Sequence, residues 1–144
     1  MEQRTQIDKV EPKAYEGMFA LEKYLSQSTL DKGLVHLLKI RASQINGCAF
    51  CINMHTQEAL SDREDPKRIF LLDAWEETDM FTEMERAVLR MTEEVTLIHK
   101  AGLTSDSYDR AANCFTENEI SQIIMAIVTI NAWNRIAIAT RKPF

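Results

Sequence analysis

The chain has 144 residues, of which 45% are hydrophobic and 27% charged, and its formal net charge is -5. This composition is that of an ordinary soluble protein with one core, and we expect a single domain over residues 1–144. The acidic balance, without a dense basic cluster, argues against a nucleic-acid partner. No run of about 20 apolar residues and no signal-peptide core is found, so we expect a cytoplasmic protein that does not engage a membrane.

In the first half of the chain, apolar residues recur at helical spacing between breaks. Pro12 fits the first turn of a helix that runs to about residue 25. Asp31 is a candidate N-cap for the next helix, which we expect to end at the turn signal Asn46-Gly47. A further helix is expected from there to about residue 60.

The second half of the chain contains several helix-start signals. Asp65-Pro66 combines an N-cap with a proline at the first helical position. Two capping-box patterns, at residues 82–85 and 116–119, each open a helix, and we expect Gly102 to end the first of these. A shorter helix is expected over residues 105–113, and the β-branched stretch that follows is long enough to favour a buried helix over a strand. The sequence therefore predicts an all-α fold of roughly seven helices.

The segment that indicates chemistry is Asn-Gly-Cys-Ala-Phe-Cys-Ile-Asn-Met-His at residues 46–55. Its Cys48, Cys51 and His55 are spaced by three and four, so on a helix they share one face. The positive end of a helix favours the thiolate, most strongly at Cys48, whereas an imidazole one turn away can take the proton of Cys51. A Cys-x-x-Cys pair in an intracellular chain is more often a redox or metal site than a structural staple.

His36, in the preceding helix, leaves a metal site open as an alternative. If the two helices fold antiparallel, Cys48, Cys51, His55 and His36 could form a Cys2His2 set suited to zinc. The spacing is not that of a zinc finger, and three ligands from one helix fit a tetrahedron poorly. Two further interpretations remain: Glu58 either orients the imidazole or lies on a solvated helix face, and both cysteines could be small buried hydrophobes.

The core motif of the carboxymuconolactone decarboxylase family, in its alkyl hydroperoxidase D (AhpD)-like branch, resembles residues 37–55, Leu-Leu-Lys-Ile-Arg-Ala-Ser-Gln-Ile-Asn-Gly-Cys-Ala-Phe-Cys-Ile-Asn-Met-His. The resemblance continues through Trp75, the stretch at residues 81–89 and Asn-Ala-Trp-Asn-Arg at 131–135, so it covers nearly the whole chain. It implies an all-helical protomer that assembles through its helices, as a trimer or hexamer. It also implies a thiol-dependent peroxidase activity or a related disulfide reductase activity.

The family's pattern assigns a role to each residue of the motif. The second cysteine, here Cys51, attacks the peroxide, and the first, here Cys48, resolves the sulfenic acid as a disulfide. The histidine after the pair, here His55, belongs to a proton relay. The family's active peroxidases have a relay glutamate where this chain has His36, and a further relay histidine between the cysteines is absent here. The resemblance therefore supports the thiol chemistry better than the full relay.

We thus expect a hydroperoxide reductase with an antioxidant role, which needs no cofactor or metal and is reset by an external dithiol or protein reductant. Cys51, Cys48, His55 and His36 are its candidate catalytic residues. A carboxymuconolactone decarboxylase-type enzyme is the second interpretation, although that reaction would not need two cysteines in redox register. The third is a zinc-stabilised or non-catalytic oligomeric protein.

Overall fold

The structure is a computed structural model that describes residues 2–143, and within that range it contains helices and no strand. The all-α prediction is confirmed, with more and shorter helices than expected. In chain order the elements are α1 (Ile7–Val10), α2 (Pro12–Ser26), α3 (Lys32–Asn46), α4 (Ala49–Ser61), α5 (Pro66–Leu71), the 3₁₀ helix η1 (Leu72–Glu77), α6 (Glu83–Thr96), α7 (Ile98–Ala101), α8 (Ser105–Ala112) and α9 (Glu117–Thr140).

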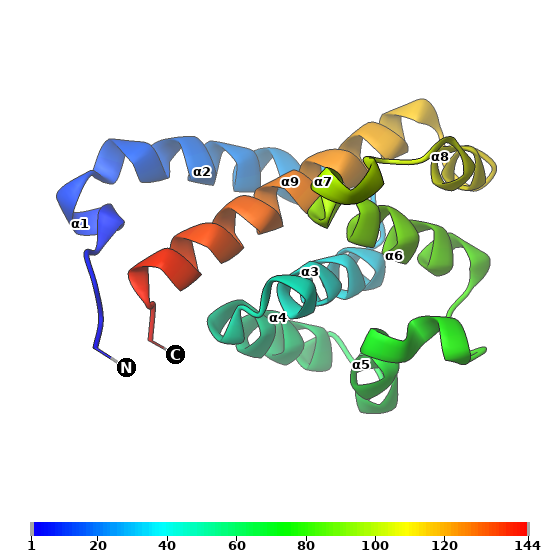
Figure 1. The fold of residues 1–144 in the computed structure, drawn as a ribbon, viewed down its shortest axis with the longest axis horizontal. Coiled ribbons are helices and arrows are strands. Elements are labelled where there is room, and N and C mark those ends of the chain that lie inside the picture. Colours follow the sequence, from blue (N-terminus) through cyan, green and yellow to red (C-terminus); the bar gives the residue numbers. More distant parts are fainter. Residues whose placement is uncertain (1, 144) are drawn as a thin grey trace.

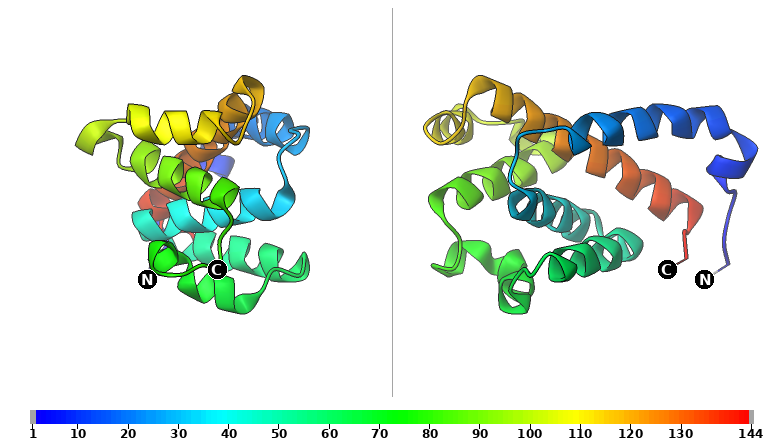
Figure 2. Two further views of the ribbon diagram at one scale, coloured as in Figure 1. Left: turned by 90° about the vertical axis from the view of Figure 1, so that its right-hand side faces the viewer. Right: turned by 180° about the vertical axis from the view of Figure 1, so that it is seen from behind.

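Helix α3 is the centre of the arrangement, because it packs against α4, α6 and α9. In Figure 1, α4 lies beneath α3, while α9 runs above it and extends along α2. Seen from behind in Figure 2, α1 and α2 form an arm at the outer side of α9, and the two chain ends lie close together. The α3–α4 hairpin and the C-terminal half of α9 therefore meet in one region of the molecule.

The apolar core has two large parts on either side of α3. One lies between α3, α6, α8 and α9 and includes the fully buried Leu38, Val88 and Ile127. The other lies between α3, α4, α5, η1 and α6 and includes Leu37 and Trp75. A third, small cluster holds the two motif cysteines against α9. The α3 helix thus contributes apolar faces to both large clusters, which fixes its position relative to α4 and α9.

The predicted N-terminal caps are confirmed. The Asp31 side chain accepts a hydrogen bond from the backbone N–H of Leu34 at 3.0 Å, and the capping boxes at Thr82 and Thr116 are both present. These local side-chain bonds satisfy backbone donors at the start of each helix, so a short sequence pattern is enough to predict them.

Gly102 does not end the helix that starts after Thr82, contrary to the sequence-based prediction. Helix α6 ends at Thr96, Leu97 leaves the helical conformation with φ -98° and ψ 39°, and Gly102 instead ends the separate short helix α7. In the sequence, Ile98 continues the helical spacing of the apolar residues of α6 past the break at Leu97. The Ile98 side chain is 57% exposed, so it does not hold the chain against the core.

The β-branched stretch after residue 116 forms a helix, as predicted, and this helix is α9. In the part of the chain that the structure describes, it is the one helix long and apolar enough, at 24 residues, to span a membrane by length and composition. Half of its most apolar window is buried inside the protein. Its hydrophobicity is accounted for by packing against α2, α3 and α6.

Candidate redox site

The turn that opens the site depends on Gly47. This residue ends α3 in the left-handed conformation, with φ 68° and ψ 34°. Residues with a Cβ atom adopt this conformation at a cost, whereas glycine does so freely. The reversal places the start of α4 against the last turn of α3, so Cys48 and Cys51 lie beside the end of α3.

A buried amide network joins the end of α3 to α9 next to this turn. The Asn46 side-chain NH₂ donates to Oδ1 of Asn131 at 3.0 Å and to Oδ1 of Asn134 at 2.8 Å. The side chain of Asn134 is fully buried and donates in turn to Ser43 Oγ at 3.0 Å. Because these bonds join residues about 90 positions apart, they hold α9 beside the first turn of α4.

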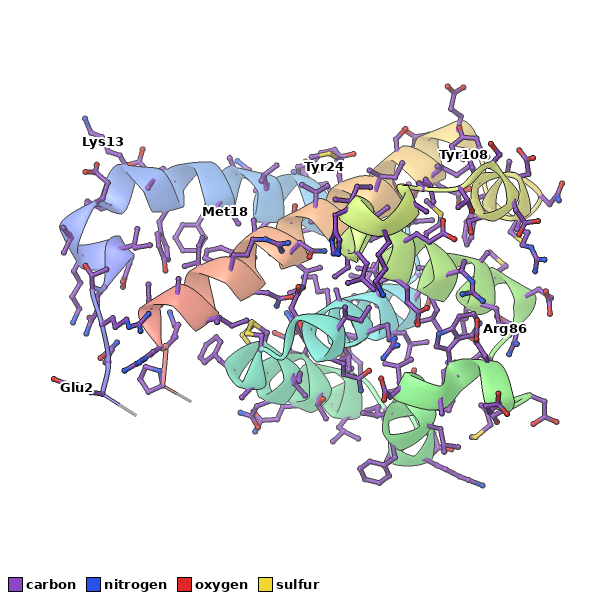
Figure 3. All side chains as sticks on the ribbon, viewed as in Figure 1. Glu2, Lys13, Met18, Tyr24, Arg86 and Tyr108 are labelled. Carbon is purple, nitrogen blue, oxygen red and sulfur yellow. A yellow bond between two sulfur atoms is a disulfide. The ribbon has the colours of Figure 1, made fainter. Side chains whose placement is uncertain are left out.

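Cys48 and Cys51 form a disulfide, with their Cα atoms 5.4 Å apart. Figure 3 shows it as the yellow bond near the start of α4, close to α9. Cys48 is the N-cap of α4 and lies just before its first turn. Its Sγ accepts a hydrogen bond from the backbone N–H of Cys51 at 3.3 Å. The two residues are only 1% and 2% exposed, so a reagent must enter a cavity to reach them.

Cys51 and His55 line the same cavity, which has a volume of about 300 Å³. Helix α4 brings them together because they are four residues, about one turn, apart. The cavity walls are mostly apolar and come from α2, α4 and α9, with aromatic and aliphatic side chains of Tyr15, Phe19, Phe50, Met54, Trp133, Ile136 and Ala137. Tyr15 and Trp133 pack edge to face, with ring centroids 5.4 Å apart, and close one side of it.

His55 has a carboxylate partner on its own helix. Glu58 Oε2 lies 2.7 Å from His55 Nδ1, so Glu58 orients the imidazole, as one of the two sequence interpretations proposed. Burial lowers the pKa of His55 below 6.5; the hydrogen bond that His55 donates to Glu58 opposes this shift, and the nearby Lys39 adds to it. The neutral imidazole, with Nδ1–H donated to Glu58, leaves Nε2 as the basic atom.

Two charged residues of this cavity were missed by sequence reasoning. Lys39 and Glu22 form an ion pair at 3.5 Å, and Trp133 Nε1 donates to Glu22 at 2.9 Å. Lys39 comes from α3 and Glu22 from α2, so no local spacing connects them to the cysteine motif. Only the packing of α2 against α9 and of α3 against α4 brings them to the cavity.

The structure does not bring His36 to the cysteines. Its Nε2 lies 2.8 Å from Oδ2 of Asp62, and it lines a different cavity, of about 550 Å³, between the start of α3 and the end of α4. Within residues 2–143 no group of three or more His, Cys, Asp or Glu side chains is placed to hold a metal. The geometry therefore gives the Cys2His2 interpretation no support.

The fold and the motif can now be compared with known proteins. The sequence pattern of the carboxymuconolactone decarboxylase family matches residues 12–94. The chain belongs to this family. It is also 39% identical over 139 residues to the uncharacterized protein YdfG of Bacillus subtilis, covering 96% of this chain and 95% of that protein.

Similar structures support the same assignment. A protein of unknown function from Agrobacterium tumefaciens, tentatively named as an antioxidant defence protein AhpD, has a TM-score of 0.95 and 39% identity, covering 99% of this chain and 97% of that one. An uncharacterized peroxidase-related protein from Ralstonia eutropha is described as having an alkylhydroperoxidase AhpD core. It has a TM-score of 0.81 at 18% identity, covering 94% of this chain and 73% of that one. The second likeness shows the fold alone. The family resemblance predicted from the sequence is thus confirmed.

Proposed function

We propose that this protein is a thiol-dependent hydroperoxide reductase in which Cys51 attacks the peroxide and Cys48 resolves the product. The observation that carries the proposal is the arrangement around Cys51, which is bonded to Cys48 and shares a largely apolar cavity with His55. A cavity with aromatic walls suits the organic part of an alkyl hydroperoxide better than it suits hydrogen peroxide alone.

In the first step, the Cys51 thiolate attacks one peroxide oxygen. An S–O bond forms, the O–O bond breaks, and the alkoxide takes a proton through His55 and leaves as an alcohol. In the second step, Cys48 attacks the sulfenic sulfur of Cys51. An S–S bond forms, and hydroxide leaves with a proton as water. Two electrons from an external dithiol or protein reductant then restore both thiols.

The test is peroxide consumption by wild type, Cys51→Ser and Cys48→Ser with cumene hydroperoxide as the substrate and dithiothreitol as the reductant. We expect Cys51→Ser to abolish turnover. Cys48→Ser should perform the first step and accumulate a sulfenic acid on Cys51 that a dimedone probe labels. Cys114→Ser, which alters the one free cysteine of the described residues, is the control and should keep the wild-type rate. Labelling of Cys48 in Cys51→Ser, with no labelling of Cys51 in Cys48→Ser, would reverse the two roles.

We also propose that the protein works in the cytoplasm as a helical trimer or hexamer. Exposed apolar side chains of α2 and α9 support assembly: Tyr24 is 43% exposed and Val128 is 45% exposed. Sedimentation of the purified protein at micromolar concentration tests this, and a monomer there would contradict it.

A further inference from the structure

The two cysteines of the disulfide line different cavities. Cys51 lines the cavity that contains His55, whereas Cys48 lines a second cavity of about 690 Å³ at the start of α4 and the end of α9. Phe50, Ala137 and Lys142 line both cavities, so they form the wall between them. The disulfide thus joins a cysteine that lines one cavity to a cysteine that lines the other.

The cavity at Cys48 is positively charged. Arg4, Arg141 and Lys142 line it, and no aspartate or glutamate among residues 2–143 does. None of the three cations forms an ion pair with another described side chain. Arg4 is held in place by the chain end of α9, since its backbone N–H donates to Thr140 at 3.0 Å and its guanidinium to Ala139 at 3.3 Å. In a protein of net charge -5, three cations that line the same cavity as Cys48 form a local field that attracts anions.

We propose that the Cys48 cavity is the reductant site, and that it takes a low-molecular-weight thiol that carries carboxylates. This inference rests on the proposed function and names the electron donor that it requires. Cys48 lines this cavity and is itself only 1% exposed, so a small thiol that enters the cavity approaches it more readily than a folded protein does. The three cations select an anionic molecule by charge complementarity.

The reaction follows from this geometry. The thiolate of the small molecule attacks Cys48 Sγ and forms a mixed disulfide, while the Cys48–Cys51 bond breaks and its electron pair leaves on Cys51. The leaving thiolate is then in the cavity of His55, where the peroxide reacts. A second thiolate attacks the small-molecule sulfur of the mixed disulfide and releases Cys48. Two protein thiolates and one small-molecule disulfide result, so two electrons are transferred.

The experiment follows the reduction of the oxidised protein in the absence of peroxide, by the appearance of protein thiols. The reductants are mercaptosuccinate, 2-mercaptoethanol and cysteamine, which carry two negative charges, none and one positive charge on their non-thiol groups, compared at equal thiolate concentration. For wild type we expect mercaptosuccinate to be fastest, cysteamine slowest, and the preference for mercaptosuccinate to shrink with added salt. In Arg4→Gln/Arg141→Gln that preference should fall about tenfold, while the rate with 2-mercaptoethanol stays close to wild type.

Arg63→Gln is the matched control. Arg63, like Arg141, follows the end of a helix with a positive φ (69° and 52°), and it lies at the opposite end of α4 from Cys48. It should keep the wild-type charge preference. Quenching with acid and peptide mapping should locate mercaptosuccinate on Cys48.

Three results would overturn the proposal: an unchanged preference in the double variant, an adduct on Cys51, or faster reduction by a thioredoxin than by mercaptosuccinate. Because no peroxide is present, the outcome does not depend on the peroxidase assay. If wild-type protein shows no peroxidase activity but still prefers mercaptosuccinate, the proposed function is rejected and the reductant site at Cys48 stands.

Discussion

Glu58 holds the imidazole of His55 from one helical turn away, with 2.7 Å between its Oε2 and His55 Nδ1. The family's relay carboxylate is expected at position 36, where this chain has a histidine. In this structure a carboxylate reaches the imidazole from α4 itself, three residues after His55. Glu58 therefore fixes the tautomer of His55 and partly offsets the lowering of its pKa by burial.

The first prediction concerns this pair. Glu58→Gln keeps a hydrogen-bond acceptor near Nδ1 but removes the negative charge that supports a protonated imidazole, so we expect peroxide consumption to fall about tenfold. Glu58→Ala should lose more. The measurement is the single-turnover rate with reduced protein. Wild-type rates in both variants would show that the carboxylate has no part in the proton transfer.

The second prediction concerns His36, which the sequence made a candidate relay residue. Its Nε2 is bonded to Asp62 and its cavity is separate from that of Cys51. A relay residue contributes about 100-fold or more, and we expect His36→Gln to change the rate by less than about twofold. A fall in the single-turnover rate of about 100-fold would show that His36 does take part in the proton relay.

The third prediction is a titration. Burial lowers the pKa of His55 below 6.5 in the oxidised protein, with Lys39 adding to the shift. NMR of the imidazole should give a midpoint below 6.5, and Lys39→Met should move it upward. A midpoint above 6.5 would contradict the burial argument.

The same shift links pH to stability. The unfolded chain binds a proton at His55 more readily than the folded protein does. The neutral His55 therefore imposes no cost on folding above pH 6.5. The free energy of unfolding declines as the pH falls from 6.5 towards the lower pKa of His55 in the folded protein. Urea unfolding across this window should show a steeper loss for wild type than for His55→Gln.

The fourth prediction tests the amide network between α3 and α9. Asn134→Ala removes one of the two bonds that Asn46 donates and the bond that Ser43 Oγ accepts, at a fully buried position, so we expect unfolding to require about 2–4 kcal/mol less. Asn53→Ala, at an exposed position of α4, is the control and should change stability by less than about 0.5 kcal/mol. Urea denaturation measures both, and equal effects would show that the network adds no stability.

The fifth prediction compares two glycines. Nothing lies within 4 Å of a Cβ added at either Gly47 or Gly17, so only the backbone distinguishes them. Gly47 has φ +68°, and Gly47→Ala should cost about 1–2 kcal/mol. Gly17 lies inside α2, where Gly17→Ala should stabilise by about 0.5–1 kcal/mol. Thermal unfolding gives both values, and the same sign for the two would refute the backbone argument.

Local features were predictable from the sequence because their partners are a few residues apart. The capping boxes, the N-cap at Asp31 and the spacing of Cys51 and His55 each depend on one or two turns of a single helix. The break at Leu97 was not predictable, because it reflects the lost core contact of Ile98 and not a residue that disfavours helix.

By itself, the sequence determined the helical class, the family and the register of the two cysteines with the histidine. The tertiary structure decided the surroundings of that motif: His36 faces Asp62, whereas Lys39 and Glu22 join the cavity of Cys51. It also decided that the two cysteines line different cavities. The physical reason is that these contacts join separate helices, whose packing depends on the buried faces of the whole chain and not on any short spacing.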